Sequence, residues 1–305
     1  MLSLGPEGRK TETDTDERFK GRDRMKVEIV DYKAPDAAET LSRSLRDTGF
    51  AVLKNHPITP ERIEAIYDSW GGFFAGDNKF DYAVQPPAHD GYFAFQSENA
   101  KDSQVKDLKE FFHVYPGCRL PADIEEKTRQ IYADLDSLGC ELLGWIQQQA
   151  PAEVTDTLSM PLDQMMDGSN QSLLRILHYP PVEQSEPGAI RAAAHEDINL
   201  ITLLLSGSKP GLQAMDKAGN WHDVVCDPGM ITINNGDMLA MATDDYYPST
   251  THRVTNPDAG QNVSRYSMPM FLHPRPEVLL KPGTTADDYL QERLREIGLK
   301  SQKAS

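Results

Sequence analysis

Three side chains in this sequence have the types and the spacing of a metal site. His195 and Asp197 stand two residues apart, and residues i and i+2 of an extended chain project to the same face. His252 follows 55 residues after Asp197, a separation that accommodates several strands before the chain returns to the same end of a barrel. Two imidazoles and one carboxylate leave three coordination positions open, which suits non-haem Fe(II) that must also hold a co-substrate and dioxygen. The pattern therefore predicts an iron site.

A second pair has the chemistry of an anion site. Arg265 and Ser267 also stand two residues apart, so they share one face of a strand. A guanidinium offers a bidentate fork to a carboxylate, and a nearby hydroxyl adds one more donor. On the residues alone, the alternatives are a surface ion pair for Arg265 and a small strand residue for Ser267.

The segments that must position these residues have the pattern of strands. From about Leu173 onwards, short apolar runs are separated by turn-forming Pro, Gly, Asn and Asp residues. Many short strands at near-regular spacing predict a sandwich or a barrel. The apolar runs cover residues 173–179, 201–205, 211–215, 231–243 and 265–272.

The first half of the chain is predicted to be mostly helical. A helix over 37–47 is expected, because Asp36 can cap it and Gly49 can end it. Pro60 stands at the first position of a second helix, and apolar residues recur at helical spacing from Ile124 to Ile146. The remaining expectations are strands over 27–30 and 50–53, an irregular stretch over 81–110, and a last helix over 286–297.

No Gly/Ser-rich or Pro-rich linker divides these parts, so a single unit over residues 25–305 is expected. Residues 1–24 carry charge of both signs without an apolar stretch and predict a mobile polar arm. Within the unit we expect a mostly helical part over about 25–165, a β core over about 170–280 and a C-terminal helix over about 285–298.

Composition restricts the partners. The net charge of −16 opposes binding to a phosphate backbone, and no apolar run approaches the roughly 20 residues that cross a bilayer. Cys118, Cys140 and Cys226 match no zinc or disulfide pattern, which favours idle thiols in a reducing cytoplasm. We therefore expect a cytoplasmic monomer or weak homo-oligomer that binds a small molecule, with no nucleic acid and no membrane as partner.

The order H-x-D, then His252, then R-x-S resembles the Fe(II)/2-oxoglutarate-dependent dioxygenase superfamily, specifically its isopenicillin N synthase-like group. The flanking segments resemble that group in the same order and cover roughly residues 27–297. They are DTGFAVLKNHPI, LLRILHYPP, NNGDMLAMATDDYYPSTTHRV and MPMFLHPRP.

The resemblance implies a fold and a set of roles. The fold is a double-stranded β-helix, also called a jelly roll or cupin-like core, with a helical N-terminal part. His195, Asp197 and His252 match the iron ligands of the family. Arg265 and Ser267 match the pair that binds the distal carboxylate of 2-oxoglutarate, and Tyr179 matches a tyrosine that assists them.

Two departures from the family pattern concern the 2-oxoglutarate residues. Leu177 replaces an Asn that many relatives carry two residues before the Tyr, so that contact is missing or replaced. The interval from His252 to Arg265 is also longer than in the plant members, and the additional PDAGQN segment is rich in turn formers.

The implied activity is a dioxygenase that uses Fe(II), 2-oxoglutarate and O2. It couples oxidative decarboxylation of 2-oxoglutarate, to succinate and CO2, with hydroxylation, desaturation or cyclisation of a small organic substrate. One alternative is an Fe(II) oxidase of the isopenicillin N synthase type, in which Arg265 and Ser267 hold a substrate carboxylate instead. A protein that binds metal and 2-oxo acid without turnover is the other.

Four residues are candidate substrate contacts. Tyr92 and Phe93 are adjacent, so only one of them should line a pocket in extended chain, and loop packing is the alternative for both. Arg175 shares a strand face with Tyr179 and could bind a substrate anion or pair with an acidic side chain. Asn199 continues the spacing of His195 and Asp197, so it could face the same cup or cap a turn.

Overall fold

The computed structural model describes residues 25–86, 88–97, 106–181, 191–206, 211–255 and 262–296. The helices are α1 Ala37–Thr48, α2 Pro60–Ala75, α3 Glu125–Gln149, α4 Ala152–Thr155, α5 Asp237–Ala242 and α6 Ala286–Glu296, with 3-10 helices η1 Asp77–Tyr82 and η2 Gln164–Met166. The strands before the β core are β1 Ile29–Asp31, β2 Phe50–Lys54, β3 Gly91–Phe93 and β4 Glu110–Val114. Those that follow are β5 Leu173–Tyr179, β6 Ala192–His195, β7 Ile201–Leu205, β8 Leu212–Met215, β9 Trp221–Asp223, β10 Ile231–Asn235, β11 His252–Val254, β12 Arg265–Leu272, β13 Leu279–Lys281 and β14 Thr284–Thr285.

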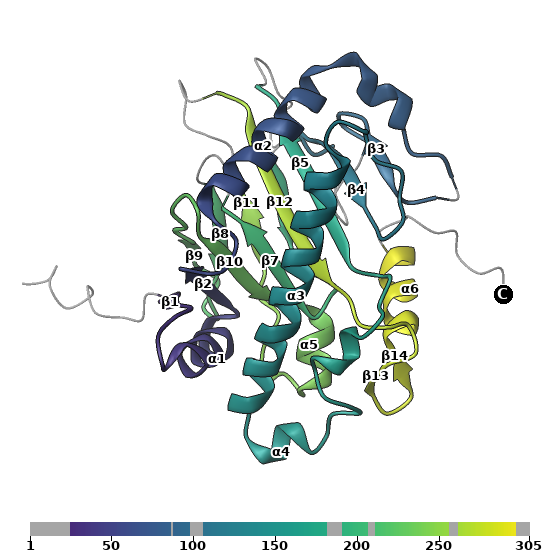
Figure 1. Ribbon diagram of the computed structural model, residues 1–305. Coiled ribbons are helices and arrows are strands. Elements are labelled where there is room, and N and C mark those ends of the chain that lie inside the picture. Colours follow the sequence, from purple (N-terminus) through teal and green to yellow (C-terminus); the bar gives the residue numbers. More distant parts are fainter. Residues whose placement is uncertain are drawn as a thin grey trace, which may run out of the picture.

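Strands β5 to β12 form two sheets that face each other. The larger sheet has the order β1-β2-β10-β7-β12-β5-β4-β3, and the smaller has the order β6-β11-β8-β9. Along the chain, β5, β7, β10 and β12 lie in the larger sheet, while the strands between them lie in the smaller one (Figure 1). This alternation is the double-stranded β-helix that the family resemblance implied.

The two faces of the larger sheet have different chemistry. Helices α2 and α3 cover its outer face (Figure 1), where Leu203, Leu205 and Met270 pack in one apolar cluster with Trp70 and Leu142 of the helices. Because side chains alternate along a strand, the intervening residues point inward, toward the smaller sheet. Thr202, Asn234, Ser267 and Arg265 are such residues, and all are buried there. The inner face is therefore the polar lining of a cup.

Two parts of the chain differ from the prediction. Residues 81–110 are not wholly irregular, since β3 lies within them and β4 begins at their end, and both extend the larger sheet beyond β5. These strands are too short to give a clear period-2 pattern. The run over 231–243 is not one strand but β10 followed by α5, because the chain turns at Gly236.

The predicted ends of several elements also moved. Asp36 precedes α1, but its side chain makes no capping hydrogen bond, whereas Gly49 ends the helix with a left-handed φ of 73° as expected. The first strand starts at Ile29 rather than at residue 27. The predicted arm over 1–24, most of the PDAGQN segment and the predicted helix end at residue 297 lie outside the described residues. No helix in the described ranges is long and apolar enough to cross a bilayer.

Candidate metal centre and its surroundings

The smaller sheet brings the two predicted histidines together. His195 ends β6 and His252 begins β11, and these residues are directly opposite in the antiparallel register. Opposite residues project to the same side of a sheet, and the two ring centroids lie 4.4 Å apart. Asp197 follows β6 in a turn, and its Oδ1 lies 3.8 Å from the Nε2 atom of each histidine. Potential ligand atoms of the three residues all lie within 4.8 Å of one another.

Backbone carbonyls fix the orientation of both imidazoles. Nδ1 of His195 lies 2.7 Å from the Ala193 oxygen, and Nδ1 of His252 lies 3.1 Å from the Thr250 oxygen. A neutral imidazole that donates from Nδ1 keeps a lone pair on Nε2. Both lone pairs then face Oδ1 of Asp197, and such carbonyl bonds are the usual support for metal-ligating histidines.

The carboxylate of Asp197 is held through its other oxygen. Oδ2 accepts hydrogen bonds from Thr202 Oγ1 at 2.6 Å and from Asn234 Nδ2 at 2.8 Å. Both donors lie on the inner face of the larger sheet, so the turn after β6 is fastened to the opposite sheet. The sequence analysis did not identify Thr202 or Asn234 as site residues. Only Asn234 could have been noticed in the sequence, because it is the first residue of the NNGD segment that resembles the family.

The pKa shifts of His195 and Asp197 favour a bound cation at neutral pH. Desolvation of the ring by its surroundings and the nearby His252 lower the pKa of His195 to about 4, although 43 % of the side chain is exposed, so the imidazole is neutral at pH 7. Burial works to raise the pKa of Asp197, but the two histidines in their protonated form and the hydrogen bonds from Thr202 and Asn234 outweigh it, so the pKa is lowered and the group is a carboxylate at neutral pH. One ionised carboxylate beside two imidazoles fits a non-haem Fe(II) centre with open positions.

Three further predicted residues meet at one end of the cup. Arg265 is opposite Tyr179 in the register of β12 and β5, and its guanidinium carbon lies 5.2 Å from the Tyr179 ring centroid. Ser267 follows on the same face, and all three residues are buried. Leu177, opposite Ser267, packs against Tyr179 and Phe111, so an apolar contact replaces the family's amide.

Of the two adjacent aromatic candidates, Phe93 is the one that faces inward. It stacks on Phe111 with ring centroids 4.5 Å apart, in the apolar cluster that contains Tyr179. Tyr92 points to the outer face, where it is 2 % exposed and its hydroxyl donates to Glu110 Oε2 at 2.5 Å. Of the two alternatives, Tyr92 is thus the residue that packs in the core, because strand alternation directs it away from the cup.

Arg175 lies on the inner face of β5. Its Nε donates to His113 Nε2 at 2.8 Å, and its guanidinium carbon lies 4.8 Å from the Phe111 ring centroid and 5.7 Å from that of Phe271. Phe271 is opposite Thr202, the residue that holds Asp197. Arg175 is thus part of the cup wall on the side of the metal ligands.

Asn199 is a structural residue rather than a pocket residue. Its side chain has no exposed surface, and its Nδ2 donates to the Ile201 oxygen at 2.6 Å and to Thr202 Oγ1 at 3.1 Å. Of the two alternatives for Asn199, its contacts favour the turn cap, because the chain turns after Asp197 and strand spacing no longer applies. Asn199 instead caps this turn beside Thr202.

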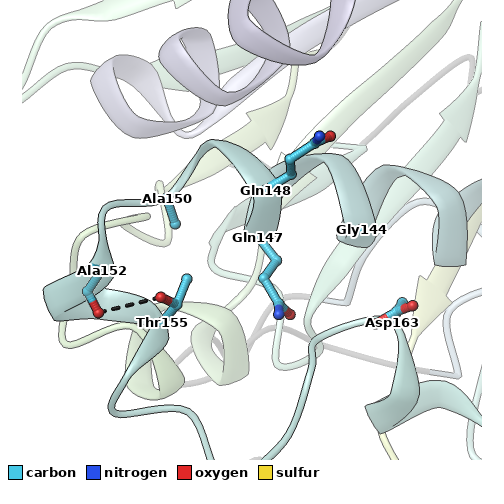
Figure 2. A pocket seen from close by; sticks show the side chains of 7 residues that line it. All are labelled: Gly144, Gln147, Gln148, Ala150, Ala152, Thr155 and Asp163. Carbon is cyan, nitrogen blue, oxygen red and sulfur yellow. Dashed lines mark hydrogen bonds between the residues drawn. The ribbon is translucent and has the colours of Figure 1, made fainter.

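A hollow of about 530 Å³ lies away from these residues, between the end of α3 and α4 (Figure 2). It is lined by Gly144, Gln147, Gln148, Ala150, Ala152, Thr155 and Asp163. None of the metal-site residues contributes to it, and its single carboxyl side chain offers no paired chemistry. We assign it no part in the reaction.

Comparison with known proteins supplies the family. Residues 170–274 match the profile of the 2OG-Fe(II) oxygenase superfamily, and residues 23–133 match that of the non-haem dioxygenase in morphine synthesis N-terminal region. A 2-oxoglutarate-Fe(II) type oxidoreductase from Aspergillus fumigatus is 30 % identical over 260 residues, which cover 76 % of this chain and 74 % of that protein.

Two solved structures extend the likeness. A candidate oxygenase from Shewanella oneidensis has a TM-score of 0.81 and 48 % identity, covering 90 % of this chain and 100 % of that chain. A candidate 2OG-Fe(II) oxygenase family protein from Caulobacter crescentus has a TM-score of 0.73 and 35 % identity, with coverages of 89 % and 99 %. Together with the His-Asp-His centre, these matches show that the chain belongs to the 2OG-Fe(II) oxygenase superfamily and is a 2-oxoglutarate-dependent dioxygenase.

Proposed function

We propose that His195, Asp197 and His252 bind one Fe(II), and that Arg265, Ser267 and Tyr179 hold the distal carboxylate of 2-oxoglutarate. The observation that carries the proposal is that the two carboxylate oxygens of Asp197 have different partners. Its Oδ2 is occupied by Thr202 and Asn234, while its Oδ1 faces the two Nε2 atoms. That arrangement leaves three ligand atoms turned toward one point.

The residues of the cup have separate tasks in this reaction. Fe(II), when bound, activates O2 and so couples decarboxylation of 2-oxoglutarate, to succinate and CO2, with hydroxylation of a substrate. Arg265 neutralises the distal carboxylate of the co-substrate, and Ser267 contributes a hydroxyl donor on the same strand face. Arg265 and Ser267 are buried, so the inner face limits the access of bulk water to the distal carboxylate, whereas the His195 side chain is 43 % exposed.

For the substrate we propose a small organic molecule that lies against the wall formed by Phe93, Phe111, Arg175 and Phe271. Three aromatic rings favour a flat apolar body, and the Arg175 guanidinium favours an acceptor or anionic group at its edge. The partner of Arg175 Nε, His113, also donates from Nδ1 to the His89 oxygen, so the guanidinium is held at a fixed angle.

The direct test is succinate formation from 2-oxoglutarate under air, with Fe(II) supplied. We expect the wild-type protein to form succinate, and His195→Ala and Asp197→Ala to form none above background. Full activity in either variant would refute the assigned ligands. Substrate oxidation without added 2-oxoglutarate would favour the oxidase of the isopenicillin N synthase type, and iron binding without any turnover would favour the binding protein.

We further propose that the protein acts in the cytoplasm as a monomer or weak homo-oligomer without nucleic acid. The three cysteines are free thiols, and burial raises the pKa of each, which suits a reducing compartment. The charge of −16 opposes polyanions. Light scattering across a concentration series, and fractionation of cells that produce the protein, test the two parts.

A further inference from the structure

A second buried arginine lies at the 2-oxoglutarate end of the cup. Arg191 precedes β6, four residues before His195, and is 5 % exposed. Its guanidinium carbon lies 5.8 Å from the Tyr179 ring centroid, and that of Arg265 lies 5.2 Å from the same centroid. Tyr179 is therefore the common neighbour of two guanidinium groups.

The charge of Arg191 is not balanced by a described carboxylate. Its Nη2 donates to the Val263 oxygen at 3.0 Å, and no carboxylate within the described ranges forms an ion pair with it. Burial, and secondarily the positive charge of Arg265, lower the pKa of Arg191. A buried guanidinium without an anion is costly, and a second cation nearby adds to the cost.

A comparably buried cation elsewhere in the chain shows the contrast. Lys109 is 7 % exposed, comparably buried, and its Nζ lies 2.9 Å from Asp107 Oδ2. Lys109 thus has a carboxylate partner of its own, two residues away in the chain. Arg191 has a carbonyl in its place, which satisfies a donor but does not neutralise the charge.

We propose that Arg191 is a second guanidinium for the distal carboxylate of 2-oxoglutarate, which it holds together with Arg265 beside the Tyr179 ring. This inference rests on the proposed role of Arg265. A carboxylate between the two guanidiniums offsets the repulsion of their positive charges. The guanidiniums in turn neutralise the negative charge of the carboxylate, which the interior cannot solvate. The pair selects 2-oxo acids that carry a second carboxylate against those with an apolar end.

The proposal is tested by binding rather than turnover. The Fe(II)-loaded protein is titrated without oxygen and without substrate, and the visible charge-transfer band of the iron–2-oxo acid complex reports occupancy. The two ligands are 2-oxoglutarate and 2-oxopentanoate, which has the same five-carbon chain without the distal carboxylate. Arg191→Gln should weaken 2-oxoglutarate roughly tenfold to a hundredfold, the range expected for a lost charged hydrogen bond. It should change the Kd of 2-oxopentanoate by less than about twofold, because that ligand never reaches the guanidinium.

Two further variants sharpen the test. Arg191→Lys keeps the charge and should fall between wild type and Arg191→Gln for 2-oxoglutarate. Arg253→Gln is the matched control, because Arg253 follows His252 on β11 and stacks instead on Trp221, with its guanidinium carbon 4.0 Å from that ring centroid. It should bind both ligands as the wild type does.

The outcomes separate the alternatives. Retained binding of 2-oxopentanoate by Arg191→Gln shows that the variant is folded and its iron site intact. An equal weakening of both ligands would mean a structural role, and unchanged 2-oxoglutarate affinity would assign Arg191 to the substrate or to the fold; either result overturns the proposal. If instead the wild-type protein gave no band with 2-oxoglutarate, the proposed function itself would have failed.

Discussion

At the scale of residues, the metal site depends on side chains that cannot touch the metal. Asp197 can present Oδ1 only because Thr202 and Asn234 hold Oδ2. Neither donor belongs to a spacing pattern, and a threonine or asparagine in a strand has many ordinary uses. The proximity of His195, Asp197 and His252 was predictable from their spacing, whereas the residues that support Asp197 became visible only when the two sheets were placed face to face.

The first prediction concerns Thr202. Thr202→Val keeps the shape of the side chain and removes one of the two hydrogen bonds to Asp197, so the carboxylate should rotate more freely. We expect Fe(II) affinity to fall about tenfold to a hundredfold, as is usual when a partner of a metal ligand is lost. Anaerobic Fe(II) titration measures it.

Thr232→Val is the control for this experiment, because Thr232 is buried on β10 two residues before Asn234 and makes no hydrogen bond to Asp197. It should bind iron as the wild type does. Equal affinities for Thr202→Val and wild type would show that Asn234 alone suffices to position Asp197.

The second prediction concerns acid sensitivity and His273. Burial lowers the pKa of this imidazole from 6.5 to about 4. Between pH 6.5 and about 4, His273 is therefore protonated in the unfolded chain but neutral in the folded protein. The free energy of unfolding should fall as the pH drops through this range. His273→Phe removes this site, so between pH 7 and pH 5 it should lose up to about 2 kcal/mol less unfolding free energy than the wild type.

Urea denaturation of the iron-free protein at both pH values provides the comparison. The difference between the two pH values is the quantity of interest, since it cancels the effect of the substitution on packing. An identical loss in the variant and in the wild type would mean that His273 takes no part in the acid response.

At the scale of elements, one glycine lets two loops approach. The start of α5 donates backbone N–H groups to the turn that carries Asp197, from Gly236 to the Leu200 oxygen at 2.9 Å and from Asp237 to the Asp197 oxygen at 2.7 Å. A Cβ on Gly236 would lie 2.2 Å from the Asn199 backbone oxygen. The glycine of the NNGD segment is therefore required by the close approach of the turn that positions a metal ligand.

The third prediction follows from that contact. Gly236→Ala must displace backbone rather than a flexible side chain, so it should destabilise the protein by about 1–3 kcal/mol. It should also weaken Fe(II) binding, because the displaced turn contains Asp197. Thermal unfolding and iron titration measure the two effects.

Gly144→Ala is the matched control, since a Cβ there meets nothing within 4 Å and the residue lies inside α3. It should be neutral or stabilising by up to about 1 kcal/mol, the helix preference of Ala over Gly. Full iron affinity in Gly236→Ala would contradict the positioning role of the α5 start.

The strands that prolong the larger sheet are fastened by a buried ionic cluster on its outer face. Glu110 of β4 is 5 % exposed and lies 3.0 Å from Lys79 Nζ and 2.7 Å from His178 Nδ1. Its Oε2 also accepts from Tyr92. Burial would raise the pKa of Glu110, but the bonds from His178, Tyr92 and Lys79 outweigh it and lower the pKa, so the group is an anion.

The fourth prediction tests this cluster. Glu110→Ala leaves the partly buried Lys79 and the buried His178 without their carboxylate and should cost about 2–4 kcal/mol of unfolding free energy. Glu39→Ala, which removes an exposed pair with Arg43, should cost less than about 1 kcal/mol in the same urea experiment. Similar small costs for the two variants would mean that water reaches the Glu110 cluster.

At the scale of the whole molecule, the topology was largely predictable and the details at the cup wall were not. The short apolar runs and the turn formers between them predicted the β core. These strands have an apolar face that packs against the helices and a polar face that lines the cup. The same spacing could not decide between the two alternatives for Asn199, because the chain leaves the strand there, and β3 was missed because three residues show no period. Arg191 escaped notice because an isolated arginine before a strand has no signature until its burial is known.

The fifth prediction is that residues 25–305 unfold as one unit, as we proposed from the absence of a linker. Buried side chains of α1, α2 and α3 share one apolar cluster with β5, β7, β10 and β12. Fluorescence of the three tryptophans, Trp70 and Trp145 in the helical part and Trp221 on β9, and far-UV circular dichroism should therefore give one coincident urea midpoint. Separate midpoints would divide the chain into two cooperative units.

The most direct test of the central claim is the iron content of the protein after anaerobic equilibrium dialysis against Fe(II). The wild-type chain should retain a single iron, and His252→Ala should retain none above the level of the buffer. His222→Ala serves as the control, since His222 bonds to Asp216 in an outer turn and should not affect iron. An iron content in His252→Ala equal to that of the wild type would contradict the assignment of His195, Asp197 and His252 as the metal centre.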